Sequence, residues 1–85
     1  QAADAAYLVA VQVDAIDRSG LITDVTRVLS DMRMNIISVN AKGSRTGEFG
    51  IRLAFETPDP RHLNNVISAM RRVPGVFDVY RTQAS

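Results

Sequence analysis

The spacing of apolar residues changes along this chain, and the order of those changes constrains the fold more than any other feature. Residues 7–16 alternate between apolar and mixed positions, which predicts a strand with one face in the core. Residues 21–33 carry apolar side chains three or four positions apart, which predicts an amphipathic helix. Asn35 follows closely and is a residue type that tolerates the left-handed backbone of a helix end.

Beyond this helix the pattern predicts a hairpin, a second helix and a last strand. The strands 36–42 and 48–56 are separated by turn-forming Gly, Ser and Thr residues, which favours a hairpin. Asp59-Pro60 is typical of a helix start, because Asp caps the first turn and Pro suits the first helical position. Pro74-Gly75 ends that helix, and residues 76–81 predict the final strand.

The predicted order is therefore βαββαβ. Each helix can bury one stripe and each strand one face, so the expected fold is α+β, a ferredoxin-like two-layer sandwich with both helices on one face of a four-stranded antiparallel sheet. We expect residues 7–82 to form this domain, between a flexible leader at 1–6 and a tail at 83–85. Because such a sheet has uncovered edges, we also expect a homodimer paired through sheet edges.

Composition excludes several classes of function. The 85 residues include 10 basic and 9 acidic side chains, a net charge of +1, which predicts no strong attraction to nucleic acid or to a membrane. Cysteine is absent, so the chain has no disulfide, thiolate nucleophile or cysteine metal site. No apolar run reaches the ~18 residues of a membrane span, and a cytoplasmic location fits this composition.

The sequence offers little from which to build a catalytic site. His62, the single histidine, falls at the start of the second helix, where an exposed surface role is expected. Ser19 has no nearby histidine and no nucleophile elbow around it. Asp14 and Asp17 are three positions apart at a strand end and point to opposite faces, which suits neither shared acid–base chemistry nor a metal. We therefore predict no enzyme, no metal and no cofactor.

An RNA-recognition domain has the same order of elements and carries exposed aromatic residues on its third strand. Here Phe49 and Phe55 lie on the same face as Ile51 and Leu53, the predicted core face. The opposite face carries charged residues in place of stacking rings, so this interpretation is disfavoured.

The loop Asp17-Arg18-Ser19-Gly20 precedes the first helix and could hold a ligand. The first N–H groups of a helix lack internal partners and favour an anion such as an amino acid's carboxylate. Gly20 would let a ligand approach the backbone, and Leu21 and Ile22 could flank an apolar side chain. Asp17 could pair with an ammonium group, and Asn35 offers an amide.

A plainer interpretation of this loop is equally open on physical grounds. Asp17 or Ser19 would then cap the helix, and Gly20 would only make the turn.

The loop also resembles a known family signature. Asp17-Arg18-Ser19-Gly20-Leu21-Ile22, followed by Asp24-Val25-Thr26 and Asn35-Ile36, resembles ACT domains, small regulatory modules that often bind amino acids. Together with residues 35–39, His62-Leu63 and residues 73–81, it is most similar to the C-terminal ACT domain of RelA/SpoT enzymes. Those enzymes make and hydrolyse (p)ppGpp in the stringent response, as GTP pyrophosphokinases and hydrolases.

This resemblance implies a regulatory role and a set of site residues. The domain would signal to the catalytic domains of its parent chain, by amino-acid sensing, by dimerisation or by both. The regulatory half of long family members also contacts the ribosome and tRNA. Many family members carry Pro in place of Ser19 and Asn in place of Asp17, and a carboxylate at Asp17 would weaken anion binding. The implied effector residues are Asp17, Ser19, Gly20, Leu21 and Ile22 from one copy, with Asn35 and Ile36 from a partner.

A second hypothesis is a docking module with no small ligand. Its arginines would then meet a protein or ribosomal RNA, although the low net charge favours an ordinary solvated surface. The residues concerned are Arg45, Arg52, Arg71, Arg72 and Arg81.

Overall fold

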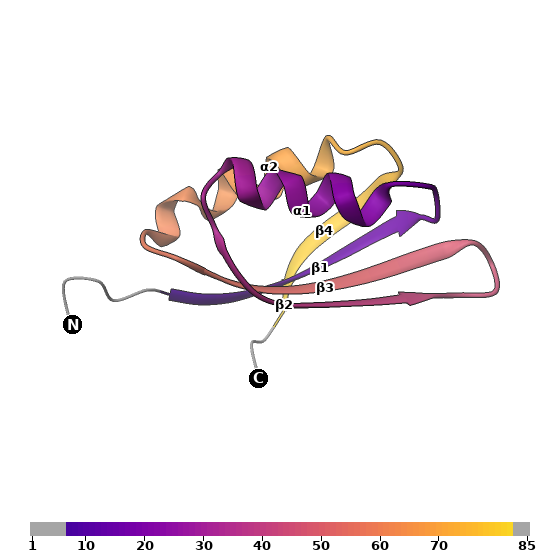
Figure 1. Cartoon of the computed structure of the whole chain (residues 1–85), viewed down its shortest axis with the longest axis horizontal. Helices are drawn as coiled ribbons and strands as arrows, with labels where there is room; N and C mark the ends of the chain where they lie inside the picture. Colours follow the sequence, from indigo (N-terminus) through magenta and orange to yellow (C-terminus); the bar gives the residue numbers. More distant parts are fainter. Residues whose placement is uncertain (1–6, 83–85) are drawn as a thin grey trace.

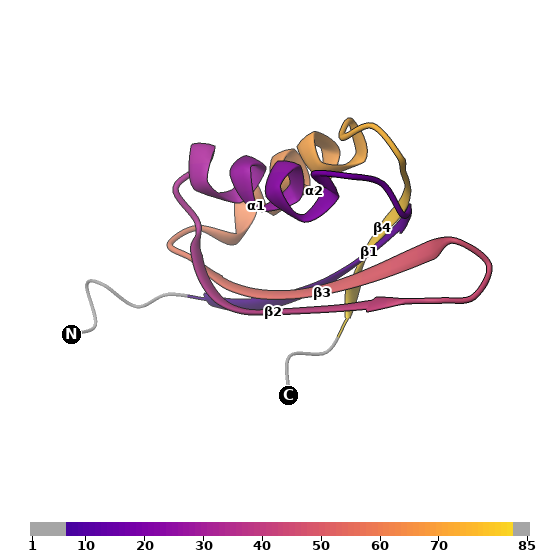
Figure 2. The same ribbon diagram turned by 45° about the vertical axis from the view of Figure 1, so that its right-hand side comes forward.

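The computed structural model describes residues 7–82 and forms the predicted two-layer sandwich (Figure 1). Four antiparallel strands form one sheet in the order β2-β3-β1-β4, and both helices lie on the same face of it (Figures 1 and 2). The elements are β1 (Tyr7–Ile16), α1 (Leu21–Asp31), β2 (Asn35–Gly43), β3 (Glu48–Thr57), the 3-10 helix η2 (Pro60–His62), α2 (Leu63–Arg71) and β4 (Val76–Thr82).

This architecture confirms the predicted fold class. The expected leader at 1–6 and tail at 83–85 lie outside the described residues. Within the described residues 7–82, neither helix has the length and hydropathy needed to cross a bilayer.

Strand β1 is one of the two inner strands of the sheet, and its helix-facing side chains form part of the core. Val11, Val13 and Ala15 are completely buried, and their neighbours Gln12 and Asp14 face away from the helices. The helices close the core with residues spaced three or four apart. The buried core consists of Val9, Val11, Val13, Ala15, Leu21, Val25, Leu29, Ile51, Leu53, Phe55, Leu63, Val66, Met70, Val73 and Val79.

Helix α1 ends at Asp31, two residues earlier than the apolar pattern predicts. The left-handed residue that ends it is Arg33, with φ 62°, and not Asn35. The Arg33 N–H donates to Ser30 O at 3.0 Å and the Met34 N–H to Leu29 O at 2.9 Å, the paired bonds of a Schellman motif. These bonds satisfy carbonyl groups at the helix end and direct the chain into β2.

The second helical segment starts as predicted at Asp59 and Pro60. The Asp59 carboxylate accepts a hydrogen bond of 2.9 Å from the Arg61 backbone N–H, and Pro60 takes the first position. This first turn is a 3-10 helix, and the α-helix begins only at Leu63. The segment therefore has a correctly predicted start and a tighter first turn than expected.

Replacing Asp59 with Asn is expected to remove an acid-sensitive part of the stability. Hydrogen bonds from the side chain and backbone of Arg61 lower the pKa of Asp59 from 3.8 to about 2. Between these values the unfolded chain binds more protons, so the carboxylate stabilises the fold above the unfolded pKa and loses this effect as the pH falls towards about 2. Urea unfolding of both proteins should show a constant stability difference down to about pH 5 that closes near pH 2. A difference that does not vary with pH would contradict this.

Candidate functional site

The β1–α1 loop (residues 17–20) delivers the chain to α1 through Gly20. This glycine has φ 81° and ψ 4° and occupies the N-cap position without a side-chain capping bond. Neither Asp17 nor Ser19 therefore caps the helix, contrary to the plainer interpretation of the loop. A left-handed N-cap of this kind suits glycine, because it has no Cβ to meet the backbone.

The first turn of α1 presents free hydrogen-bond donors. The Leu21 N–H donates to Arg18 O at 3.3 Å and the Asp24 N–H to Gly20 O at 2.9 Å. Among the described residues, the N–H groups of Ile22 and Thr23 have no acceptor. Two adjacent free N–H groups at a helix N-terminus favour a carboxylate or another small anion.

A cavity of about 160 Å³ lies beside these donors, and we call it the effector cavity. Leu21 is only 2% exposed and supports it from within the core, whereas Ile22 is 39% exposed. The partly buried Phe49 of β3 adds a second apolar side chain. Because ligand pockets of drug size measure about 300–1,000 Å³, this one suits a smaller molecule. Its lining consists of Asp17, Arg18, Gly20, Leu21, Ile22, Thr23 and Phe49.

The charges around the cavity are partly balanced. An Arg18 guanidinium nitrogen lies 2.7 Å from a carboxylate oxygen of Asp24, so the acidic residue nearest the free donors is paired. The Asp17 side chain is exposed and has no ion pair within residues 7–82. A ligand carrying both a carboxylate and an ammonium group would meet favourable partners here.

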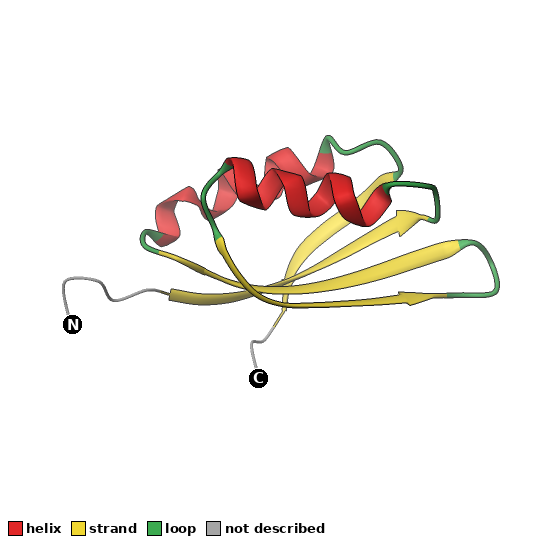
Figure 3. Ribbon diagram, viewed as in Figure 1, coloured by secondary structure: helices red, strands yellow, loops and turns green. Residues whose placement is uncertain are grey.

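The structure separates the two halves of the predicted site. Asn35 and Ile36 begin β2 at the opposite end of α1, whose 11 residues span about 16 Å (Figure 3). The Asn35 amide donates to a carboxylate oxygen of Glu56 at 3.0 Å, and Ile36 packs against the core. One chain thus brings Asp17, Gly20, Leu21 and Ile22 together, and leaves Ser19, Asn35 and Ile36 outside the cavity.

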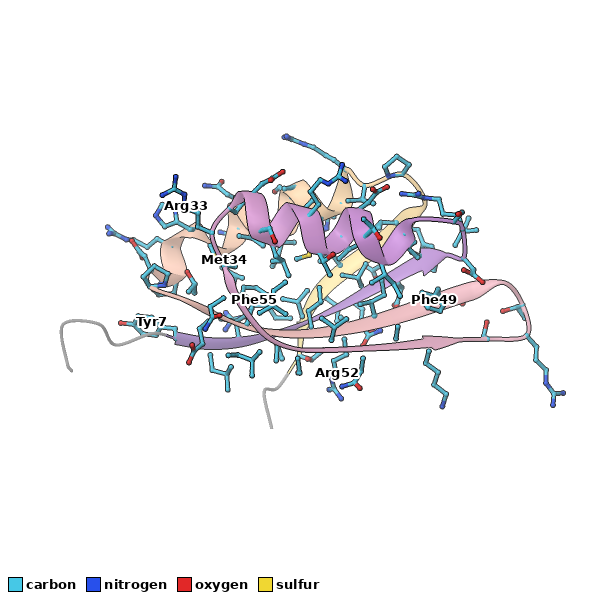
Figure 4. The ribbon with its side chains drawn as sticks, in the orientation of Figure 1. Tyr7, Arg33, Met34, Phe49, Arg52 and Phe55 are labelled. Atoms are coloured by element: carbon cyan, nitrogen blue, oxygen red, sulfur yellow. The ribbon has the colours of Figure 1, made fainter. Side chains whose placement is uncertain are left out.

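Three residues that line the cavity are absent from the predicted site: Arg18, Thr23 and Phe49. The sequence places Phe49 only in the core, yet it pairs with Ala15 at the end of β1, next to the loop, and Figure 4 shows it near the hairpin end of β3. The register of β1 against β3, which places Phe49 opposite Ala15, is the feature that could have predicted this position. Arg18 was part of the quoted motif, but its role depends on contacts with residues far along the chain.

The five arginines of the docking hypothesis do not gather on one surface. Arg52 projects from the sheet face opposite the helices (Figure 4), whereas Arg81 pairs with Val11 and lies on the helix-facing side. Arg45 lies in the β2–β3 turn, and Arg71 donates to Val79 O at 2.9 Å within the fold. Contact with RNA or the ribosome stays a prediction.

Comparison with known proteins places this geometry in a family. A family model described as an ACT domain matches residues 3–81. The chain belongs to the ACT domain family. The GTP pyrophosphokinase of Streptomyces coelicolor is 51% identical over 79 residues, which cover 93% of this chain and 9% of that protein. The bifunctional (p)ppGpp synthase/hydrolase RelA of Mycobacterium tuberculosis is 44% identical over 79 residues, covering 93% of this chain and 11% of that protein.

A solved structure shares the fold of this ACT domain. The ACT domain from the GTP pyrophosphokinase of Chlorobium tepidum superposes with a TM-score of 0.79 and 24% identity, covering 92% of this chain and all of that one. This chain is thus an ACT domain of the kind found in RelA-type GTP pyrophosphokinases, and it spans about a tenth of the length of those relatives.

Proposed function

We propose that this ACT domain binds a small apolar amino acid in the effector cavity and so regulates (p)ppGpp synthesis and hydrolysis by a RelA-type parent protein in the cytoplasm. The observation that carries the proposal is the pair of free N–H groups of Ile22 and Thr23 beside the apolar side chains of Ile22 and Phe49. The donors fit a carboxylate, and the apolar wall fits a branched side chain.

A second copy of the domain completes the site in this proposal. Asn35 donates its amide to Glu56, which leaves the Asn35 carbonyl and the Glu56 carboxylate as acceptors for an ammonium group. Both lie at the far end of α1 in their own chain, so a partner must supply them. The edge strand β2 favours such pairing, because Ile37 and Val39 are 53% and 38% exposed on it.

Binding at this interface would link the ligand to assembly. A ligand held between two copies binds the dimer and not the monomer, so it stabilises the dimer by mass action. The catalytic domains of the parent would respond only if their activities differ between monomer and dimer. An effector shifts such an equilibrium only by the difference between its affinities for the two states. The amino acid is therefore expected to change both the self-association and the balance of the two activities.

Titration of the 85-residue chain with L-valine, L-leucine or L-isoleucine tests the proposal. Amide NMR shifts are expected at Gly20, Ile22, Thr23 and Asn35, with half-saturation at about 1 mM, which corresponds to about −4 kcal/mol. L-lysine is the control, because it carries the same backbone groups and a charged side chain. Absence of shifts at these amides up to about 10 mM of all three ligands would refute amino-acid sensing by this cavity.

Sedimentation equilibrium with and without the ligand tests the role of the second copy. The dimer fraction is expected to rise with valine in the unmodified chain and to be unchanged by it in Asn35→Ala. A monomer at every concentration, with or without ligand, would exclude the shared site.

A further inference from the structure

The Arg18 side chain uses each of its guanidinium nitrogens in a different contact. Nε donates to Pro74 O at 2.6 Å, Nη1 to Ser19 O at 3.0 Å, and Nη2 to an Asp24 carboxylate oxygen at 2.7 Å. The contact with Pro74 joins residues 56 positions apart in the sequence. Arg18 thus links the β1–α1 loop and the first turn of α1 to the α2–β4 loop.

A backbone bond joins the same two loops. The Ile16 N–H donates to Gly75 O at 2.8 Å, immediately before the loop that holds Arg18. Gly75 has φ 96°, and a Cβ there would lie 3.3 Å from Arg18 Nε and 3.4 Å from Ile16 O. A side chain at this position would therefore disturb both links, and glycine permits the close approach.

Strand β4 starts directly after this junction. Val76 pairs with Ala15, and the register then shifts between Ala15 and Asp14, so the strand carries a bulge at its beginning. Phe77 lies at this bulge on the edge of the sheet and is 57% exposed. A displacement of Pro74 and Gly75 would therefore reach an exposed aromatic residue on the edge opposite β2.

Arg18 also sets the charge of the effector cavity. It lines the cavity and pairs with Asp24, one helical position after the free N–H of Thr23. Without the guanidinium, the Asp24 and Asp17 carboxylates would both repel an incoming anion. Lysine would keep one positive charge, but its single ammonium cannot serve three divergent acceptors at once.

We propose that Arg18 is a positioning residue that couples the effector cavity to the start of β4, so that the β4 edge around Phe77 responds to occupancy of the cavity. This inference rests on the proposed function for the nature of the ligand. A ligand carboxylate at the Ile22 and Thr23 N–H groups displaces the loop together with Arg18, and the bond from Arg18 Nε to Pro74 O passes the displacement to Gly75 and Val76. The dimer edge β2 and the responding edge β4 then lie on opposite sides of the sheet.

Valine titration of Arg18→Lys, followed by amide NMR, separates this coupling from binding. In the unmodified chain we expect shifts at Ile22 and Thr23 and also at Gly75, Val76 and Phe77. In Arg18→Lys the first group should persist, while the β4 shifts at saturation fall by at least about half, because the tether to Pro74 is lost. Arg27→Lys, at an exposed position of α1, should behave like the unmodified chain.

Asp24→Asn separates the electrostatic role of Arg18 from its tether. This variant removes the carboxylate partner and keeps the bond to Pro74, so the β4 shifts should remain, and valine should bind about two- to fivefold more tightly. The coupling would be overturned if valine shifted Ile22 and Thr23 but none of the amides of Gly75–Phe77 in the unmodified chain. It would also be overturned if the β4 shifts in Arg18→Lys equalled those of the unmodified chain. Either result would leave the proposed function intact.

Hydrogen exchange without ligand tests the Arg18 tether, on which the inference depends, independently of amino-acid binding. The Ile16 amide donates to Gly75 O, so its exchange in Arg18→Lys should rise at least about fivefold, while the Val11 amide in the middle of β1 should not change. Unchanged exchange at Ile16 would overturn the inference. Absence of valine shifts at Ile22 and Thr23 would instead refute the proposed function alone.

Discussion

Ile22→Glu is expected to weaken amino-acid binding strongly while the domain stays folded. Ile22 is the second residue of α1 and is 39% exposed, so the longer side chain fits without entering the core. A carboxylate in the first turn of a helix is favourable by about 0.3–1 kcal/mol. The same charge faces the free N–H groups and repels a ligand carboxylate, so the affinity for valine should fall at least about 30-fold, or about 2 kcal/mol.

Ile22→Gln is the matched control for this charge. It has nearly the same shape and removes the same apolar contact, so it should weaken binding by only about fivefold, or about 1 kcal/mol. Thermal unfolding should give an equal or higher midpoint for Ile22→Glu than for Ile22→Gln. If the two variants bound valine equally, the helix N-terminus would not be the site of the carboxylate.

The predicted strands agree with the structure because their pattern is local. Residues 7–16 alternate, and β1 has the same bounds, Tyr7–Ile16. The end of α1 was less predictable, because the preference of Asn for a left-handed backbone is weak beside the packing of larger side chains. Met32 and Met34 both pack against the core, so the chain turns at Arg33 between them.

In the candidate site, too, features set by neighbouring residues were predictable and contacts between distant residues were not. Gly20 before an apolar helix indicated an open helix start, and the structure places free donors there. The role of Arg18 could not be predicted from the sequence, because its acceptor is the backbone carbonyl of Pro74. Every residue type has such a carbonyl, so the residue type at position 74 does not identify the contact. A motif can identify a loop, whereas tertiary packing decides which distant backbone the loop contacts.

Phe55→Ala is expected to lower the free energy of unfolding by about 3–5 kcal/mol, more than any other change considered for this chain. Phe55 is completely buried on β3, between its cross-strand partners Val9 and Ile36. Replacing a buried Phe by Ala costs about 3–5 kcal/mol through lost burial and the cavity left behind. A domain of 85 residues has a total stability of about 4–13 kcal/mol, so the loss is a large part of it.

Phe49→Ala is the matched comparison on the same strand and the same face. Phe49 is only partly buried and lines the effector cavity, so its loss should cost about 1–2 kcal/mol and also weaken valine binding. Urea unfolding followed by circular dichroism measures both variants. Equal losses of stability in the two variants would mean that Phe49, under the loop, is packed as tightly in the core as Phe55. The cavity wall would then be part of the rigid core, and a ligand there could not displace the β1–α1 loop.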